Sequence, residues 1–158
     1  MSVKAIPEGY HSVTPYLIVD GAAEAIRFYE QAFGATEILR LPMGDKVGHA
    51  EIRIGDSVVM LSDEWPDSGK LGPKARGGAT AGVMIHLKDV DAAFERAVAA
   101  GATAERPVEN QFYGDRSGTI IDPFGHSWTL ATHVEDVPEK EMQRRMDEWS
   151  RSMAAETA

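Results

Sequence analysis

The sequence predicts an α+β fold in which one β-α-β-β-β unit occurs twice. Residues 12–40 are predicted to form a strand, a helix and a second strand, and residues 82–106 repeat that order. A Gly-Ala-Thr triplet follows each predicted helix, beginning at Gly34 and again, 67 residues later (101 − 34), at Gly101. A duplicated unit predicts a cleft between two related halves, and clefts are where small molecules bind.

The first unit is predicted from its hydrophobic pattern. Residues 13–19 are rich in β-branched and aromatic side chains, which is typical of a strand. We expect Asp20 to cap the helix that follows. That helix carries an apolar stripe at intervals of three or four residues, formed by Ala22, Ile26, Tyr29 and Phe33. Gly34 is suited to end the helix.

The next strands of the first unit are 36–41, 47–54 and 57–61. Within 47–54, apolar and polar residues alternate, and this period of two predicts a strand with one apolar and one polar face. The apolar face would carry Ala50, Ile52 and Ile54, and the polar face His49, Glu51 and Arg53. Gly55-Asp56 suits a tight hairpin turn into the strand at 57–61.

The second unit and a terminal helix complete the predicted organisation. A Gly- and Pro-rich linker, residues 63–80, separates a module at 12–62 from a module at 81–133, and both belong to one domain, 12–133. After Pro138 a helix is predicted to residue 153. Its apolar stripe is expected to pack on its own domain or on a subunit partner, and consists of Met142, Met146, Trp149 and Met153.

Composition excludes several classes of function. The chain of 158 residues contains no cysteine, which excludes disulfides, thiolate catalysis and cysteine-ligated zinc. The formal net charge of −9 argues against a nucleic-acid partner. No apolar run approaches the roughly 20 residues that span a bilayer, and residues 1–9 do not resemble a secretory signal. We therefore expect a soluble, cytoplasmic protein without a membrane partner.

Several short motifs carry a family resemblance. They are Val13-Thr14-Pro15-Tyr16-Leu17, Phe28-Tyr29, His49-Ala50-Glu51-Ile52, Phe112-Tyr113-Gly114-Asp115-Arg116 and Asp122-Pro123-Phe124-Gly125-His126. With the two β-α-β-β-β modules, they resemble the vicinal oxygen chelate superfamily of glyoxalases, bleomycin-resistance proteins and dioxygenases, and most of all its PhnB-like branch. The resemblance implies the glyoxalase/bleomycin-resistance fold, in which two modules form a half-barrel cleft.

The resemblance also implies where a metal would bind. Metal-dependent members take one ligand from the first strand and one from the last strand of each module, and these positions fall on Thr14, Met60, Val83 and Thr129. None of these four is a histidine or carboxylate, the donors that such metals need. We therefore expect no metal cofactor, although a divalent metal held by other residues stays a possible alternative.

Candidate functional residues follow from which way each strand faces. His49 and Glu51 are candidate acid–base groups, with Arg53 as an anion clamp; the alternative is a solvated face with an ion pair. By the offset of 67, Arg116 should face the cleft as His49 does, unless it only pairs with Asp115. If Val83 faces the cleft, His86 faces the helices.

The remaining candidates are aromatic. Tyr16, Tyr113 and Trp65 could line a site for a flat, polar molecule, although Trp65 could simply fix the linker. The turn residue His126 is expected to be structural, and His11 and His133 are expected at the surface.

Two functional classes remain open. The first is a metal-independent protein that binds and sequesters a small molecule, as bleomycin-resistance proteins do. The alternative is a lyase or isomerase of glyoxalase type, using a divalent metal or His49 and Glu51. A transferase-like reading of PhnB-like chains has no recognisable cofactor motif here. A homodimer is expected, because half-barrel sheets leave edges to be covered.

Overall fold

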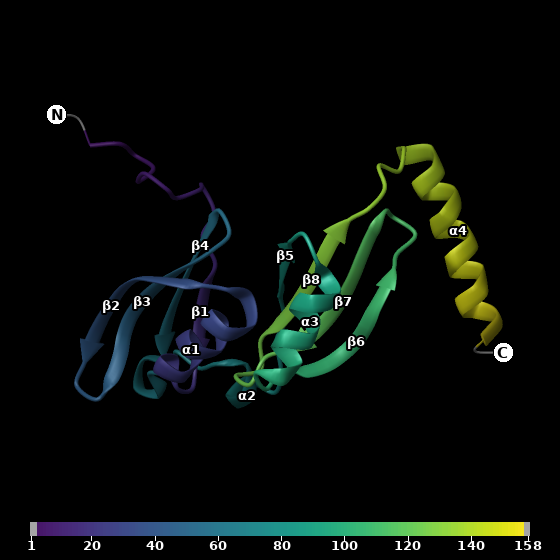
Figure 1. The fold of residues 1–158 in the computed structure, drawn as a ribbon. Helices are drawn as coiled ribbons and strands as arrows, with labels where there is room; N and C mark the ends of the chain where they lie inside the picture. Colours follow the sequence, from purple (N-terminus) through teal and green to yellow (C-terminus); the bar gives the residue numbers. More distant parts are fainter. Residues whose placement is uncertain (1–2, 157–158) are drawn as a thin grey trace.

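The computed structural model describes residues 3–156 as two strand-rich modules followed by a long helix (Figure 1). The first module contains β1 (Tyr16–Val19), α1 (Ala22–Phe33), β2 (Thr36–Met43), β3 (Lys46–Ile54) and β4 (Ser57–Asp63). The linker forms a 3-10 turn, η1 (Pro66–Ser68), and a short helix, α2 (Pro73–Arg76). The second module contains β5 (Gly82–His86), α3 (Val90–Ala99), β6 (Thr103–Asn110), β7 (Asp115–Ile121) and β8 (Ser127–His133), and α4 (Glu139–Glu156) follows.

Each module is a four-stranded mixed sheet with the same topology. The strand orders are β1-β4-β3-β2 and β5-β8-β7-β6, so the first strand of each module lies at an edge and pairs in parallel with the last. The predicted α+β fold of two β-α-β-β-β modules and a C-terminal helix is confirmed. The two sheets are separate in the described residues, and no ladder joins them into a barrel.

The core lies where the two helices meet. Helix α1 packs on β1, β3 and β4, α3 packs on β6, β7 and β8, and the helices also contact each other, as Figure 1 shows near the centre of the molecule. One hydrophobic cluster therefore extends through both modules, from Ile26 and Ile52 to Trp128 and Leu130. We call the face of each sheet that its own helix leaves uncovered the open face.

The start of α1 depends on a residue from β4. Sequence alone favours Asp20 as the cap, but the cap position is Gly21, in a left-handed conformation with φ of 97°. The side chain of Asp63 accepts hydrogen bonds from the backbone N–H groups of Gly21 (3.0 Å) and Ala22 (2.8 Å) instead. It also accepts one from Val47 N–H at 2.7 Å, so this carboxylate ties α1 to β3. The cap is thus a long-range contact, which local sequence does not reveal.

Asp122, in the turn before β8, joins the two modules. Its buried carboxylate accepts a hydrogen bond from the Tyr29 hydroxyl of α1 at 2.7 Å and another from Trp128 Nε1 at 2.8 Å. The backbone N–H groups of Phe124 and His126 donate to its other oxygen, each at 2.9 Å. Burial and the nearby Asp122 carboxylate raise the pKa of Tyr29 well above its ordinary value, so the phenol stays a donor.

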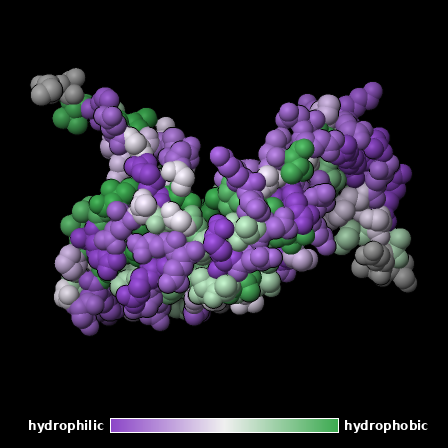
Figure 2. Space-filling model, in the orientation of Figure 1, coloured by the Kyte–Doolittle hydropathy of each residue, from purple (hydrophilic) through white to green (hydrophobic). Residues whose placement is uncertain are grey.

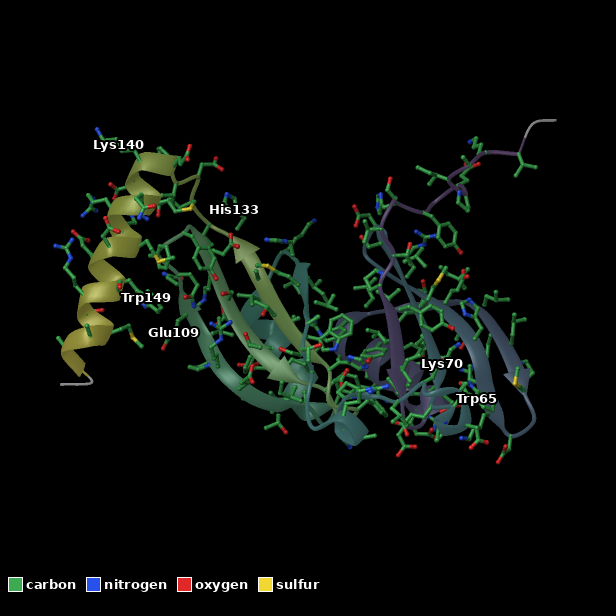
Figure 3. All side chains as sticks on the ribbon, turned by 180° about the vertical axis from the view of Figure 1, so that it is seen from behind. Trp65, Lys70, Glu109, His133, Lys140 and Trp149 are labelled. Atoms are coloured by element: carbon green, nitrogen blue, oxygen red, sulfur yellow. The ribbon has the colours of Figure 1, made fainter. Side chains whose placement is uncertain are left out.

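Helix α4 projects from the end of the second module (Figure 1). Arg145 fixes it by donating to both oxygens of Glu135, at 2.9 and 2.7 Å, and to the Phe112 carbonyl at 3.2 Å. The Trp149 ring lies 5.9 Å from that of Phe112, and Figure 3 shows Trp149 on the side of the helix that faces the sheet. Among residues 3–156, no helix is both long and apolar enough to cross a membrane.

Asp122→Ala is expected to lower the free energy of unfolding by about 3 kcal/mol, because it leaves the buried donors of Tyr29 and Trp128 without an acceptor. Urea denaturation followed by tryptophan fluorescence measures this loss. Asp67→Ala, at an exposed position in η1, is the matched control and should change stability little. A loss for Asp122→Ala no larger than that of the control would contradict this role.

Candidate functional site

The open face of the first module carries the polar residues that alternation predicted in β3. Ala50 and Ile52 are fully buried in the core, which places His49, Glu51 and Arg53 on the opposite face. The pairing of strands brings Met60 of β4 beside Glu51 and also beside Tyr16 of β1. The structure thus collects Tyr16, His49 and Glu51 on one surface.

These side chains form a continuous hydrogen-bonded chain. The Tyr16 hydroxyl lies 2.9 Å from His49 Nδ1, and His49 Nε2 lies 3.1 Å from Glu51 Oε1. Tyr10, from the segment before β1, donates its hydroxyl to the second oxygen, Glu51 Oε2. A hydroxyl, an imidazole and a carboxylate in this order can position a proton and move it along the chain.

The charge of Glu51 is set by these contacts. The hydrogen bond from Tyr10 holds the pKa of Glu51 below its ordinary value of 4.5, and the bond from His49 acts in the same direction. Burial of Glu51 opposes both effects. The same bond raises the pKa of Tyr10. If the phenol lost its proton, it could no longer donate to Glu51 and would place a second negative charge beside the carboxylate. Glu51 is therefore a buried carboxylate whose ionised form is stabilised.

Residues 9–11 lie across this open face and occupy more of it. Arg53 donates to the Gly9 carbonyl at 3.2 Å, so the predicted anion clamp is engaged with the chain's own backbone. His11 Nε2 lies 3.2 Å from the Asp56 carbonyl in the β3–β4 turn. Together with Tyr10, these contacts bring the N-terminal segment onto β3.

A cavity opens between the two modules, next to Tyr16 of β1. We call it the inter-module cavity; it has a volume of about 680 Å³ and is bounded by β1, β5 and the linker. The residues around it are mainly apolar and include Pro15, Ile18, Leu71, Val83 and Met84. A second hollow of about 700 Å³ shares Pro15, Val83 and Met84 and extends toward His86 and the Asp56 turn. Figure 2 shows the surface hollowed between the modules.

The linker forms part of the cavity wall. Gly72 is required there, because a Cβ atom at this position would lie 2.9 Å from the Ile18 carbonyl oxygen. His126 of the second module lies 2.9 Å from that same carbonyl through Nε2. The edge of β1 is therefore in close contact with both the linker and the second module.

The second module carries a histidine–carboxylate group of its own. His133 Nδ1 lies 2.8 Å from Asp115 Oδ1, and His86 Nε2 lies 3.5 Å from Asp115 Oδ2. Hydrogen bonds with Asp136 and Asp115 raise the pKa of His133, so its charged form is favoured. Asp115 itself is buried, whereas both imidazoles are more than half exposed.

This arrangement corrects the predicted orientation of β5. Val83 and Ile85 pack against the core, whereas Met84 and His86 lie on the open face, so Val83 does not face the cleft and His86 does not face the helices. The prediction shifted the inward-facing and outward-facing positions of β5 by one residue. Because side chains alternate along a strand, such a shift assigns every side chain to the wrong face. Three consecutive apolar residues, Val83, Met84 and Ile85, gave no alternation from which to orient the strand.

The positions at which the resemblance implies metal ligands do not form a suitable donor set here. On the open face of the second module, Thr129 of β8 pairs with Met84 of β5. In the first module Met60 of β4 holds the position that corresponds to Thr129, and it pairs with Tyr16 of β1. The Thr129 hydroxyl lies 3.2 Å from that of Thr119, to which the Arg106 guanidinium donates at 2.9 Å. Within the described residues, no three His, Cys, Asp or Glu side chains are placed to hold a metal ion. A divalent metal therefore does not fit these residues.

Three predicted binding residues lie away from Tyr16 and His49. Arg116 points to the helix side of its sheet and donates to both oxygens of Asp91, at 2.7 and 2.8 Å, so its expected inward orientation is wrong. The offset of 67 does not hold in β7, because Thr119 and Thr129 form the pair that Glu51 and Met60 form in the first module, an offset of 68 (119 − 51).

The other two are aromatic residues outside the chain of hydrogen bonds. Trp65 forms an isolated antiparallel β-bridge with Lys70 within the linker. Its ring lies under Lys46, whose Nζ is 5.2 Å from the ring centre. Figure 3 shows Trp65 and Lys70 low on the first module, far from His133 on the second. The Tyr113 hydroxyl lies 3.4 Å from Ser117 Oγ on the second module. Neither aromatic residue joins Tyr16.

Sequence reasoning missed Tyr10 and Asp115. Tyr10 contacts a residue 41 positions away, and nothing in its local sequence points to β3. Asp115 directly precedes Arg116. Because the repeat is offset by 68 residues in β7 and not by 67, the sequence-based prediction turned Arg116 toward the cleft instead of Asp115. An offset of 68, taken from the paired strands, would have placed Asp115 on the open face together with Ser117 and Thr119.

Tyr10→Phe is expected to raise the pKa of Glu51 and to reduce stability only where Glu51 is ionised. A lowered folded-state pKa contributes stability that is present above the ordinary value of 4.5 and is lost as the pH falls through the lowered value. Unfolding free energies measured from about pH 3 to 7 should therefore differ most between variant and wild type at the upper end. A stability difference that is independent of pH would refute this assignment.

The matched control for this experiment is Tyr113→Phe. It removes a phenol hydroxyl on the second module without touching Glu51. Its pH dependence of stability should follow that of the wild type.

Comparisons with known proteins agree with this architecture. The chain is 44% identical over 139 residues to the uncharacterized protein Mb0911c of Mycobacterium bovis, covering 85% of this chain and 91% of the relative. Among solved structures, the At5g48480 gene product of Arabidopsis thaliana superposes with a TM-score of 0.63 at 26% identity, covering 77% of this chain and 98% of that one. The PhnB protein of Bacillus cereus shares the fold, with a TM-score of 0.60 at 18% identity over 77% of this chain and 99% of that one.

The match to a family model extends through both modules. Residues 9–130 fit the model described as Glyoxalase/Bleomycin resistance protein/Dioxygenase superfamily, which includes the segment from Tyr10 to the end of the second sheet's core. The predicted resemblance is thereby confirmed. The chain belongs to the glyoxalase, bleomycin-resistance and dioxygenase superfamily.

Proposed function

We propose that the protein binds a small, largely apolar molecule in the inter-module cavity without using a metal ion. The observation that carries this proposal is the contact of Arg106 with Thr119, whose hydroxyl lies next to that of Thr129. A guanidinium at this place puts a positive charge where related proteins would hold a cation, and like charges repel. Methionine and threonine at the other positions add only weak donors.

The cavity itself supports binding of a small molecule. Its volume of about 680 Å³ lies within the usual range of ligand sites, which is roughly 300–1,000 Å³. Apolar walls with a few polar residues, here among others Thr80 and Ser127, are typical of such sites. Sequestration of the bound compound, the role that bleomycin-resistance proteins have, is the biological role that we infer.

Acid–base catalysis without a metal is the second candidate. It is favoured by the contact of 3.1 Å between His49 Nε2 and Glu51 Oε1, which orients the imidazole. An enzyme of this kind would be a lyase or isomerase that moves a proton through His49. Turnover of the bound molecule distinguishes it from a binding protein.

We also propose that the protein is a homodimer. Two apolar surfaces are half exposed in the single chain: the α4 stripe of Met146, Trp149 and Met153, and the edge strand β2 with Leu41 and Met43. Exposed edge strands and apolar stripes of this kind are usually covered by a partner.

Met84→Trp is expected to weaken ligand binding by at least about tenfold, because the larger side chain fills the inter-module cavity. The measurement is a thermal-shift screen of small aromatic compounds, followed by titration of those that raise the melting temperature. Val98→Trp is the control, since Val98 is about as exposed as Met84 but lies on α3 and does not line the cavity. Equal affinities in both variants would place binding outside this cavity.

The same titration after treatment with a chelator tests the metal-independent part of the proposal. Affinity should be unchanged, and elemental analysis should find no stoichiometric metal in the purified protein. About one nickel, zinc or manganese ion per chain would contradict the proposal.

Light scattering at micromolar concentration should give twice the mass of the chain. Trp149→Glu places a charge in the apolar stripe of α4 and should shift the protein toward the monomer. Glu148→Gln, at the neighbouring exposed position, is the control and should remain a dimer. A monomeric wild type would exclude the dimer.

A further inference from the structure

The chain's own N-terminal segment occupies polar groups on the open face of the first module. We call residues 9–11 the N-terminal strap. The Tyr10 hydroxyl donates to Glu51 Oε2, and the Gly9 carbonyl accepts a hydrogen bond from Arg53 at 3.2 Å. The strap lies close to the guanidinium, because a Cβ atom at Gly9 would be 3.0 Å from Arg53 Nη2. The strap thus offers β3 one phenol donor and one carbonyl acceptor.

Few other contacts hold the strap to the module. His11 Nε2 lies 3.2 Å from the Asp56 carbonyl in the β3–β4 turn. Within the described part of the chain, the strap belongs to no strand, and the hydrophobic core includes no residue before Leu17. Residues 3–8 are exposed, and Figure 1 shows the chain projecting away from the module toward its N-terminus. A segment that buries so little apolar surface can detach locally while the rest of the fold stays intact.

Detachment of the strap would expose a pair of opposite charges on β3. Glu51 and Arg53 are two residues apart on the same face, so their Cα atoms are separated by about 7 Å. The Glu51 side chain is held from its other side by His49, whose Nε2 lies 3.1 Å from Oε1. Among residues 3–156, no carboxylate lies within ion-pair distance of Arg53, which instead contacts a neutral carbonyl. The charge of Arg53 is therefore available to an anion.

We propose that this pair on β3 binds a small hydroxylated carboxylic acid, and that the strap is a built-in competitor which the acid displaces. The strap shows the groups that fit, since a phenol donates to Glu51 and an acceptor faces Arg53. A carboxylate is a stronger acceptor than the Gly9 carbonyl, because it takes two charge-assisted hydrogen bonds from one guanidinium. The inter-module cavity contains no residue of β3, so this site is separate from that of the proposed function.

Three probes of one shape test the recognition of both groups. Para-hydroxybenzoate carries a phenol and a carboxylate at opposite ends of a ring. Para-methoxybenzoate has no proton for Glu51, and para-hydroxybenzamide has no negative charge for Arg53. NMR titration of the full-length protein should give at least about fivefold tighter binding of para-hydroxybenzoate than of either relative, the worth of one hydrogen bond. Equal affinities, or binding only in the inter-module cavity, would overturn the inference and leave the proposed function standing.

Tyr10→Ala tests whether the strap competes with the ligand. The variant loses the contact between the strap and Glu51, so a larger fraction of molecules has a free site. Para-hydroxybenzoate should therefore bind about fivefold tighter than to the wild type. A purely structural role of Tyr10 would leave the affinity unchanged or weaken it, and either result would overturn the inference. Tyr113→Ala is the matched control on the second module and should keep the wild-type affinity.

Arg53→Gln separates recognition of the carboxylate from release of the strap. The variant removes the cation and also loosens the strap at Gly9, so the informative quantity is the ratio of two affinities. The preference for para-hydroxybenzoate over para-hydroxybenzamide should disappear. A preference that survives without the guanidinium would overturn the inference.

Displacement of the strap is also measurable in the wild type. Backbone order parameters of Gly9 and Tyr10 report motion on the picosecond to nanosecond timescale. When para-hydroxybenzoate saturates the protein, these order parameters should fall below about 0.6, the value that marks a flexible backbone. Bound probe beside a strap that stays ordered would overturn the inference.

Discussion

The structure depends on one buried carboxylate, that of Asp122. Each module on its own has a helix on one face of a sheet, and the shared core forms only if α1 and α3 are held against each other. Asp122 does this by accepting hydrogen bonds from Tyr29 of the first module and from Trp128 of the second, while the backbone N–H groups of its own turn hold it in place. Because its acceptor capacity is filled, the charge can be buried without a counterion. The position of the inter-module cavity follows from this contact.

How much the sequence could predict differed between the two modules. In β3, strict alternation placed His49 and Glu51 on one face, and the structure has them there. In β5, the uninterrupted apolar run gave no such information, so the side chains of Val83 and His86 were assigned to the wrong faces. The local repeat predicted the fold because hydrophobic periodicity is a local property. The contacts that complete the sites are long-range pairings, such as Tyr10 with Glu51, and no local pattern encodes them.

The two open faces show how one duplicated architecture can diverge. Both keep a histidine beside a carboxylate, but the first places its pair on one strand and the second assembles it from β5, β7 and β8. The positions at which the resemblance implies metal ligands hold methionine and threonine, with a guanidinium nearby. Family membership therefore fixes the fold on which the site is built, whereas the individual residues at the site decide which chemistry it supports.

The contacts at the edge of β1 have a consequence for solubility. An uncovered strand edge offers unpaired backbone groups to any other extended chain, and this is a common route to aggregation. Here His126 Nε2 lies within hydrogen-bond distance of the Ile18 carbonyl, and the backbone of Gly72 lies so close that a side chain would not fit. A foreign strand therefore meets an edge that is already occupied. Replacing Gly72 with a bulkier residue would push the linker away, which would uncover this edge and favour precipitation as well as disturb the cavity wall.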